Sequence, residues 1–199
     1  MKNKILVIFL IALIFSILIY KITISSKINI LILGDKYFFN SNFKTYDTFL
    51  KDKYYNVNNL LTEENDTYKN IKDKIKSNYS IKIKNRKMYL SQEISKANYI
   101  IISANNKQYN EKCNKSKKIT NYYINKTNTE INSLIYIINK ISSSKIIIMD
   151  NSCSNNDANY THIKLKQDIN NTNNTKSKLS LKDNYFIFTK LVNKIEEKN

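Results

Sequence analysis

The chain alternates between short, continuous apolar runs and longer stretches in which apolar residues recur at helical spacing. Three of the runs are five or six residues long and rich in isoleucine: Ile28–Leu33, Tyr99–Ser103 and Lys145–Met149. Runs of this length and composition are typical of strands that are buried on both faces of a sheet. The alternation over Tyr160–Leu165 predicts a fourth strand, and Tyr55–Val57 predicts a shorter one.

Helical patterns fill the intervals between these runs. Apolar residues spaced by three and four predict five helices, over Phe43–Tyr54, Thr62–Ile75, Leu90–Ala97, Ile119–Ile141 and Phe186–Ile195. Thr62 with two following acids indicates a helix start, and Ser91 is a candidate cap. Strands that alternate with helices predict the α/β fold class, here a three-layer α/β/α arrangement with a mainly parallel sheet.

Functional sites in such folds form at the carboxyl ends of the strands. In this chain, that rule selects three segments, Gly34–Lys36, Ser103–Asn106 and Asp150–Ser154.

An unbroken apolar segment, Ile5–Tyr20, lies near the N-terminus between flanking lysines. As a helix it spans about 24 Å, slightly less than a hydrocarbon core of about 30 Å. We favour an uncleaved, single-pass membrane anchor, and a cleaved signal peptide or a buried helix are the alternatives. The predicted organisation is an anchor and tether over residues 1–27, followed by one domain over 28–199. The short N-terminal segment is expected inside the cell and the domain outside it, either anchored or secreted after cleavage.

Composition excludes several classes of site. One glycine excludes the dinucleotide-binding and P-loop glycine motifs, and one histidine with two cysteines excludes the common zinc motifs. No metal and no cofactor is therefore expected. The formal net charge is +17, but the lysines are scattered and Arg86 is the only arginine. A specific nucleic-acid partner is not expected. Cys113 and Cys153 form a disulfide or remain two thiols, and both readings stay open.

The segment Ile30–Asp35, with the sequence ILILGD, resembles the first block of the SGNH (GDSL-type) hydrolases, where a strand runs into Gly-Asp-Ser. Met88–Lys107 resembles the third block, in which a helix leads into a strand, a glycine and, two places on, an asparagine. Asn105 matches that asparagine, which belongs to the oxyanion hole of the family. Lys182–Ile195 resembles the last block, where an Asp-x-x-His segment begins the final helix. The resemblance implies an SGNH-like, flavodoxin-like domain.

The sequence departs from this family at the catalytic positions. Lys36 stands in place of the nucleophilic serine, Ser103 in place of the third-block glycine, and the expected histidine is missing near Lys182. The only histidine, His162, falls in the predicted fourth strand, where a structural role is the simpler interpretation. Ester hydrolysis by this route needs a nucleophile, a base within reach and oxyanion donors. The resemblance thus implies a vestigial site made of Gly34, Asp35, Lys36, Ser103, Asn105 and Lys182.

The leading hypothesis is a membrane-anchored, catalytically inactive SGNH-like domain that acts in binding or as a cell-surface scaffold. Its cationic cleft would suit an anionic ligand or a cell-envelope polymer. One alternative is an active hydrolase of cell-envelope acyl esters that uses Ser41 or Ser103 with His162 as base. The other is a basic protein that binds anionic polymers or lipid headgroups through its net charge.

Overall fold

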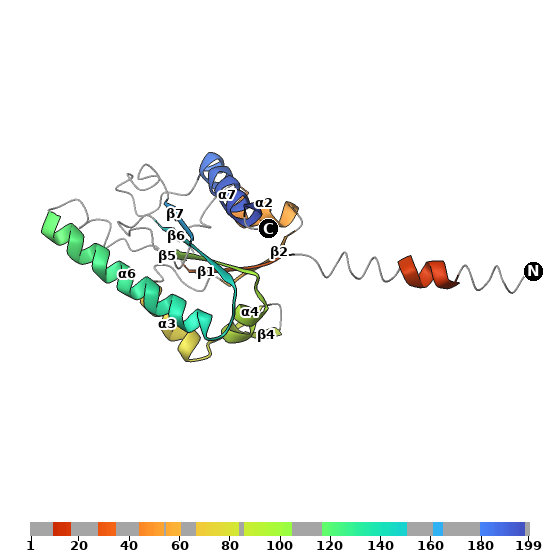
Figure 1. Cartoon of the computed structure of the whole chain (residues 1–199), viewed down its shortest axis with the longest axis horizontal. Coiled ribbons are helices and arrows are strands. Elements are labelled where there is room, and N and C mark those ends of the chain that lie inside the picture. The colour runs from red at the N-terminus through yellow and green to blue at the C-terminus, as the bar shows by residue number, and fades with distance from the viewer. Residues whose placement is uncertain are drawn as a thin grey trace, which may run out of the picture.

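Helices cover both faces of a single parallel sheet in the computed structural model of the chain (Figure 1). The structure describes residues 10–16, 28–34, 44–53, 55–60, 67–83, 86–104, 117–150, 161–164 and 180–197. The α/β class expected from the sequence is confirmed.

Five parallel strands make up the sheet, in the order β2-β1-β5-β6-β7. Their bounds are β1 Asn29–Gly34, β2 Asn56–Asn59, β5 Tyr99–Ala104, β6 Lys145–Asp150 and β7 Thr161–Lys164. Numbered along the chain, this is the order 2-1-3-4-5 of one common doubly wound arrangement. The three isoleucine-rich runs form β1, β5 and β6, the central strands, where consecutive residues are buried because helices cover both faces of the sheet.

Two apolar cores lie on opposite faces of the sheet. On one face, Ile30, Ile32 and Ile101 pack against helices α2 (Tyr46–Asp52) and α7 (Leu181–Glu196). On the other face, Leu31 and Ile100 belong to a core built with three further helices. These are α3 (Tyr68–Lys76), α4 (Leu90–Lys96) and α6 (Lys117–Asn139). Alternate residues of one strand thus serve opposite cores, which confirms the three-layer arrangement.

Two helix starts differ from the sequence expectation. Helix α3 begins after Thr67, whose side chain accepts a hydrogen bond from the backbone N–H of Asn70 at 3.2 Å, and not at Thr62, which lies outside the described residues. Ser91 does not cap α4, because the helix already begins at Leu90. Instead, the Ser91 hydroxyl donates to Asn78 at 2.6 Å and ties α4 to the end of α3.

A two-stranded antiparallel hairpin, β3 (Ser80–Ile83) and β4 (Arg86–Tyr89), connects α3 to α4. The apolar pattern predicts no element here, because the segment is short and its lysines interrupt the pattern. Ile81 and Met88 are opposite each other in the hairpin and pack against the core beneath. The hairpin is therefore seated on the domain by one of its faces.

Within the predicted anchor, residues 10–16 are helical and exposed. The rest of the segment lies outside the described residues. Among the helices that the structure describes, none is both long and apolar enough to cross a membrane. The membrane anchor stays a prediction.

Candidate functional site

The carboxyl ends of β1 and β5 meet at Gly34 and Ser103, which are register partners. The φ angle of Gly34 is +123°, a conformation that side chains with a Cβ rarely adopt. A Cβ built on Gly34 would lie 1.8 Å from the carbonyl oxygen of Ser103. Only glycine fits at this position, because the two backbones approach too closely for any side chain.

Ser103 is completely buried beneath this contact, with 0% of its surface exposed. Its hydroxyl donates to the carbonyl of Leu33 at 3.4 Å and lies beside the phenol of Tyr46. A buried hydroxyl that is held by neighbouring groups has no path to a substrate, which weighs against Ser103 as a nucleophile.

Tyr46 is the first residue of α2, and its side chain is fully buried over the end of the sheet. Burial raises the pKa of the Tyr46 phenol well above its ordinary value, and the neighbouring Asp47 carboxylate acts in the same direction. The nearby Ser103 hydroxyl acts on this pKa in the opposite direction. The phenol is thus held in its neutral form.

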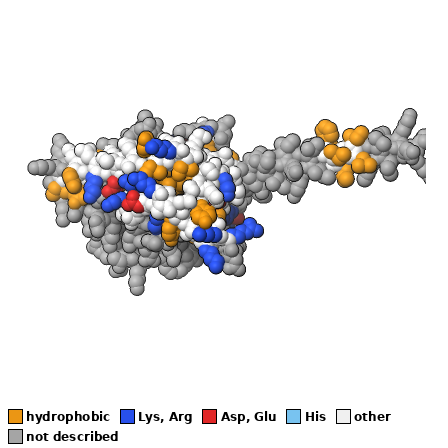
Figure 2. All heavy atoms as spheres, turned by 90° about the horizontal axis from the view of Figure 1, so that it is seen from below, with side chains coloured by type: hydrophobic (Ala, Val, Ile, Leu, Met, Phe, Trp, Pro, Cys, Tyr) orange, Lys and Arg blue, Asp and Glu red, His pale blue; other side chains and the backbone are white. Residues whose placement is uncertain are grey.

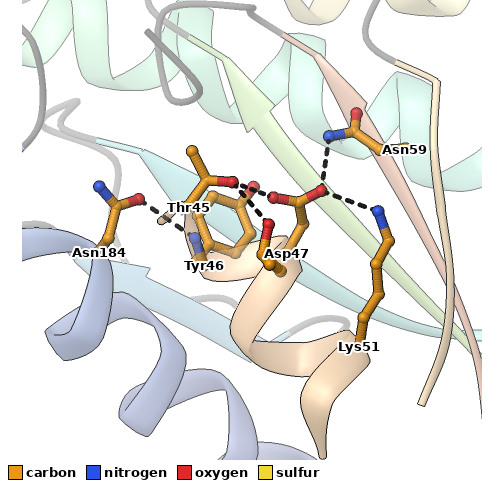
Figure 3. Close-up of polar contacts among 7 residues, drawn as sticks. Thr45, Tyr46, Asp47, Lys51, Asn59 and Asn184 are labelled. Carbon is orange, nitrogen blue, oxygen red and sulfur yellow. Dashed lines mark hydrogen bonds and ion pairs between the residues drawn. The ribbon is translucent and has the colours of Figure 1, made fainter. Parts of the chain in front are cut away.

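Asn184 joins the last helix to this site (Figure 3). Its amide oxygen accepts a hydrogen bond from the backbone N–H of Tyr46 at 3.2 Å, and its amide nitrogen donates to the carbonyl of Ser180 at 3.0 Å. The residue is completely buried. The first turns of α2 and α7 are therefore fastened together at the carboxyl edge of the sheet.

The Asp47 carboxylate is the centre of a polar cluster beside Tyr46, drawn in Figure 3. It accepts hydrogen bonds from the Thr45 hydroxyl, from the Lys51 ammonium at 3.2 Å and from the Asn59 amide at 3.4 Å. Asp47 is buried, and these three donors stabilise its carboxylate. The residue lies in the first turn of α2, where the helix dipole favours a negative charge. The hydrogen bond between Asp47 and Asn59 holds α2 against β2.

The segment that resembles the last block of the family begins α7. Ser180 and Asp183 form a capping box, in which each side chain accepts a hydrogen bond from the backbone N–H of the other, at 3.2 Å and 3.0 Å. Lys182 lies between them and is exposed. Because Asn184 contacts Tyr46 and Tyr46 contacts Ser103, Lys182 belongs to the same edge of the domain as Gly34.

The remaining expected site residues, Asp35, Lys36 and Asn105, lie outside the described residues, as do Cys113 and Cys153. Asp35 follows Gly34 and Asn105 comes two places after Ser103, so their places in the chain adjoin the described site.

His162 lies in β7, as the sequence predicts. It is the register partner of Ile148, whereas Ser103 is the register partner of Met149. Strand β6 stands between the two residues, so their backbones are two strand spacings apart, about 9–10 Å.

Sequence reasoning did not select Tyr46 and Asn184 as site residues. For Asn184 a signal existed, because it occupies the same helix face as Ile187, Leu191 and Ile195, which are all buried. An amide at a core-facing position of the first turn indicates a specific buried partner. Tyr46 gave no comparable signal, since an aromatic residue on an apolar helix face is ordinary core material.

Among the described residues, no group of three or more histidine, cysteine, aspartate or glutamate side chains is placed to hold a metal ion. The chain matches no model of a known protein family and no curated protein.

Proposed function

We propose that this chain is a membrane-anchored, SGNH-like domain that binds a ligand or serves as a scaffold at the cell surface without turning over ester substrates. The observation that carries the proposal is the pairing of Gly34 with Ser103. These residues come from the two segments that resemble the first and third blocks of the family. Their meeting at the carboxyl ends of adjacent parallel strands is what one common site would require.

The strand order supports the same proposal. A sheet in the order 2-1-3-4-5, with helices on both faces, is a framework in which ligands bind at the carboxyl edge. The start of α7, where the family has its histidine-bearing segment, is fastened to that edge through Asn184 and Tyr46.

Loss of hydrolysis is inferred from the residues at the catalytic positions. Lys36 stands where the family has its nucleophilic serine, and the sequence has no histidine near Lys182, where the family has its base. The segment around Lys182 is used as a helix cap, and Ser103 is buried. With nucleophile and base both missing, only a small residual acceleration would remain.

An anionic group is the ligand class that this edge suits best. Lys36 and Lys182 would supply positive charge, and Asn105 an amide donor, at the rim of the site. A carboxylate or phosphate on a cell-envelope polymer has the complementary charge.

The anchor is proposed from residues 10–16. Leu10, Ile11, Leu13, Ile14 and Phe15 expose between 50% and 63% of their surface. Exposed apolar side chains on successive positions of a helix require a partner, and a lipid bilayer provides one on all sides. The Ser16 hydroxyl donates to the carbonyl of Ala12 at 2.8 Å, so the polar side chain is satisfied within the helix, as lipid demands.

Hydrolysis of short acyl esters by the full chain in detergent tests the loss of activity. We expect background rates for the unaltered protein and for Lys36→Ala. Turnover that is abolished by Lys36→Ala would overturn the proposal. Turnover abolished by Ser103→Ala, Ser41→Ala or His162→Ala would favour the active hydrolase instead.

Membrane attachment is tested by fractionation. We expect the full chain to stay with membranes after alkaline carbonate washing, and the variant Leu13→Lys with Ile14→Lys to be released, because charges at the centre of a spanning helix are costly. Added protease should reach the domain from the outside of intact cells. Release of the unaltered chain by carbonate, or protection of the domain from protease, would contradict the anchor or its orientation.

A further inference from the structure

The β3–β4 hairpin presents a basic surface that no described acidic residue neutralises. Between Ser77 and Gln92 the chain has four basic residues and no acidic one, and its only arginine is Arg86. The side chains of Lys82, Arg86 and Lys87 are exposed, and none forms an ion pair with a residue that the structure describes. Elsewhere, lysines such as Lys51 and Lys96 are paired with carboxylates.

Two of these charges directly oppose each other. Lys82 and Lys87 are register partners on adjacent antiparallel strands. Like charges at such positions destabilise a hairpin, particularly one of only two short strands. An external negative charge would remove this repulsion.

Aromatic rings accompany the basic side chains. The Lys87 ammonium lies 5.1 Å from the ring centre of Tyr89, and the Lys74 ammonium lies 5.8 Å from that of Tyr79, which is 38% exposed. Tyrosine and lysine together are typical of protein surfaces at the boundary between lipid headgroups and water. Ile81 and Met88 hold one face of the hairpin on the core, so Lys82 and Lys87, which alternate with them along the strands, are on the face that points away from it. Arg86 alternates the other way and is exposed at the first position of β4, next to the turn of the hairpin.

The hairpin lies at the end of the domain where the central strands begin. It leads directly into α4, which ends next to the start of β5, and Asn98 there accepts a hydrogen bond from the backbone N–H of Asn29, the first residue of β1. Figure 1 shows β4 beside α4 at this end of the sheet. Figure 2 shows basic side chains, with apolar ones between them, gathered at the same right-hand end of the domain.

The chain before β1 brings this end close to the bilayer. Seven residues, 21–27, separate the apolar segment from Ile28, and they span at most about 25 Å. Wherever the tether lies, the start of β1 stays within that distance of the end of the apolar segment. The carboxyl edge of the sheet, with Gly34 and Ser103, lies about 20 Å farther along the strands.

We propose that the β3–β4 hairpin docks on the anionic headgroups of the membrane that holds the anchor, through Lys82, Arg86, Lys87 and the neighbouring tyrosines. This inference rests on the proposed membrane anchor. Docking would orient the domain with its carboxyl edge, and so the candidate site, facing away from the bilayer. The ligand chemistry is the phosphate of an anionic phospholipid, gathered at a surface of negative potential.

The chain has no tryptophan, so a single one can report on the hairpin. The full chain with Tyr79→Trp is reconstituted into vesicles of phosphatidylcholine, with and without phosphatidylglycerol, and quenching by bromine-labelled lipids is measured. We expect quenching that requires the anionic lipid and falls at high salt. Tyr122→Trp, an exposed aromatic position near the start of α6, is the matched control and should be quenched in neither vesicle.

Substitutions that remove single charges identify the residues that contact the anionic lipid. Each basic residue near an anionic surface contributes about a fivefold preference for it. Lys82→Gln, Arg86→Gln and Lys87→Gln together should therefore weaken docking by about a hundredfold and abolish the lipid-dependent quenching. Lys69→Gln, Lys126→Gln and Lys190→Gln remove the same charge elsewhere on the domain and should leave it in place.

The outcomes separate this inference from the anchor on which it rests. If the protein is extracted from both kinds of vesicle by carbonate, the anchor itself fails. If the protein stays anchored but the Tyr79→Trp signal is the same with and without anionic lipid, docking is overturned. Equally, docking is overturned if the hairpin variants lose binding to a soluble polyanion such as RNA while lipid quenching is unchanged.

Discussion

Asn184 and Tyr46, which are 138 positions apart, are joined by a hydrogen bond of 3.2 Å from the backbone N–H of Tyr46 to the side-chain oxygen of Asn184. The bond is buried, and the other end of the same amide holds the carbonyl of Ser180. One side chain thus satisfies polar groups at the first turns of two helices that cover the same face of the sheet.

Replacement of Asn184 should destabilise the domain. Asn184→Ala removes the buried acceptor of the Tyr46 backbone N–H, whereas the Ser180 carbonyl still accepts from the backbone N–H of residue 184, and we expect a loss of about 2 kcal/mol in the free energy of unfolding. Asn184→Asp keeps the acceptor for Tyr46 but not the donor to Ser180, and should be intermediate. Urea unfolding measures both. Asn193→Ala, an exposed position of the same helix, is the control and should change little; an equal effect at both positions would refute the role of Asn184.

Gly34→Ala should be the most damaging single-methyl change at the site. The new Cβ would meet the carbonyl oxygen of Ser103, and the φ angle of +123° is itself strained for alanine. We expect a loss of at least about 2 kcal/mol, measured as a lower thermal midpoint.

A second substitution tells backbone conflict from side-chain conflict. Ser103→Gly should not rescue Gly34→Ala, because the opposing atom belongs to the backbone. Recovery of stability in the double variant would contradict the close approach of the Gly34 and Ser103 backbones.

Tyr46 should make stability depend on alkaline pH. Because burial raises the pKa of its phenol in the folded state, the unfolded chain loses this proton first as the pH rises. The stability that the protonated Tyr46 phenol contributes is fully present below about pH 10. Above this pH, the free energy of unfolding falls by at most about 1.4 kcal/mol per pH unit.

The variant Tyr46→Phe removes this titration. The slope of unfolding free energy against pH above about pH 10 should become shallower in Tyr46→Phe. The raised pKa of Tyr55, which is partly buried beside Glu196, should leave some slope in both proteins. Tyr136→Phe changes an exposed phenol and serves as the control. An unchanged slope in Tyr46→Phe would mean that the phenol is accessible to hydroxide.

Replacing the buried carboxylate of Glu93 should cost more stability than replacing the exposed carboxylate of Glu197. It accepts hydrogen bonds from Asn58 and from Lys96, both at 2.9 Å, and so ties α4 to the edge strand β2. Glu93→Ala should cost about 2 kcal/mol of unfolding free energy. Glu197→Ala breaks an exposed pair with Lys194 and should cost less than about 1 kcal/mol. Similar losses for the two variants would count against a buried role for Glu93.

The pattern of apolar residues along the chain predicted the strands that are buried on both faces. The strands β1, β5 and β6 are continuous apolar runs because two layers of helices cover them, and burial of that kind leaves a direct mark on composition. The hairpin was missed because one of its faces is exposed and lysine-rich, so only Ile81 and Met88 carry the signal of burial. The start of α3 was misplaced because Thr62 and Thr67 are equally good caps by residue type.

The candidate site was predicted only in part, for a related reason. Gly34 and Ser103 were selected since carboxyl strand ends are readable from the chain. Tyr46 and Asn184 depend on a contact between segments far apart in sequence, and no local pattern encodes such a pair.

The amino-acid sequence by itself determined the α/β class and the parallel sheet, because apolar periodicity is a local consequence of burial. Tertiary structure alone decided that Gly34 has no space for a side chain, that Asn184 fastens two helices and that Lys82 faces Lys87. Each of these facts concerns a distance across space, and such distances are set only when the strands and helices have packed together.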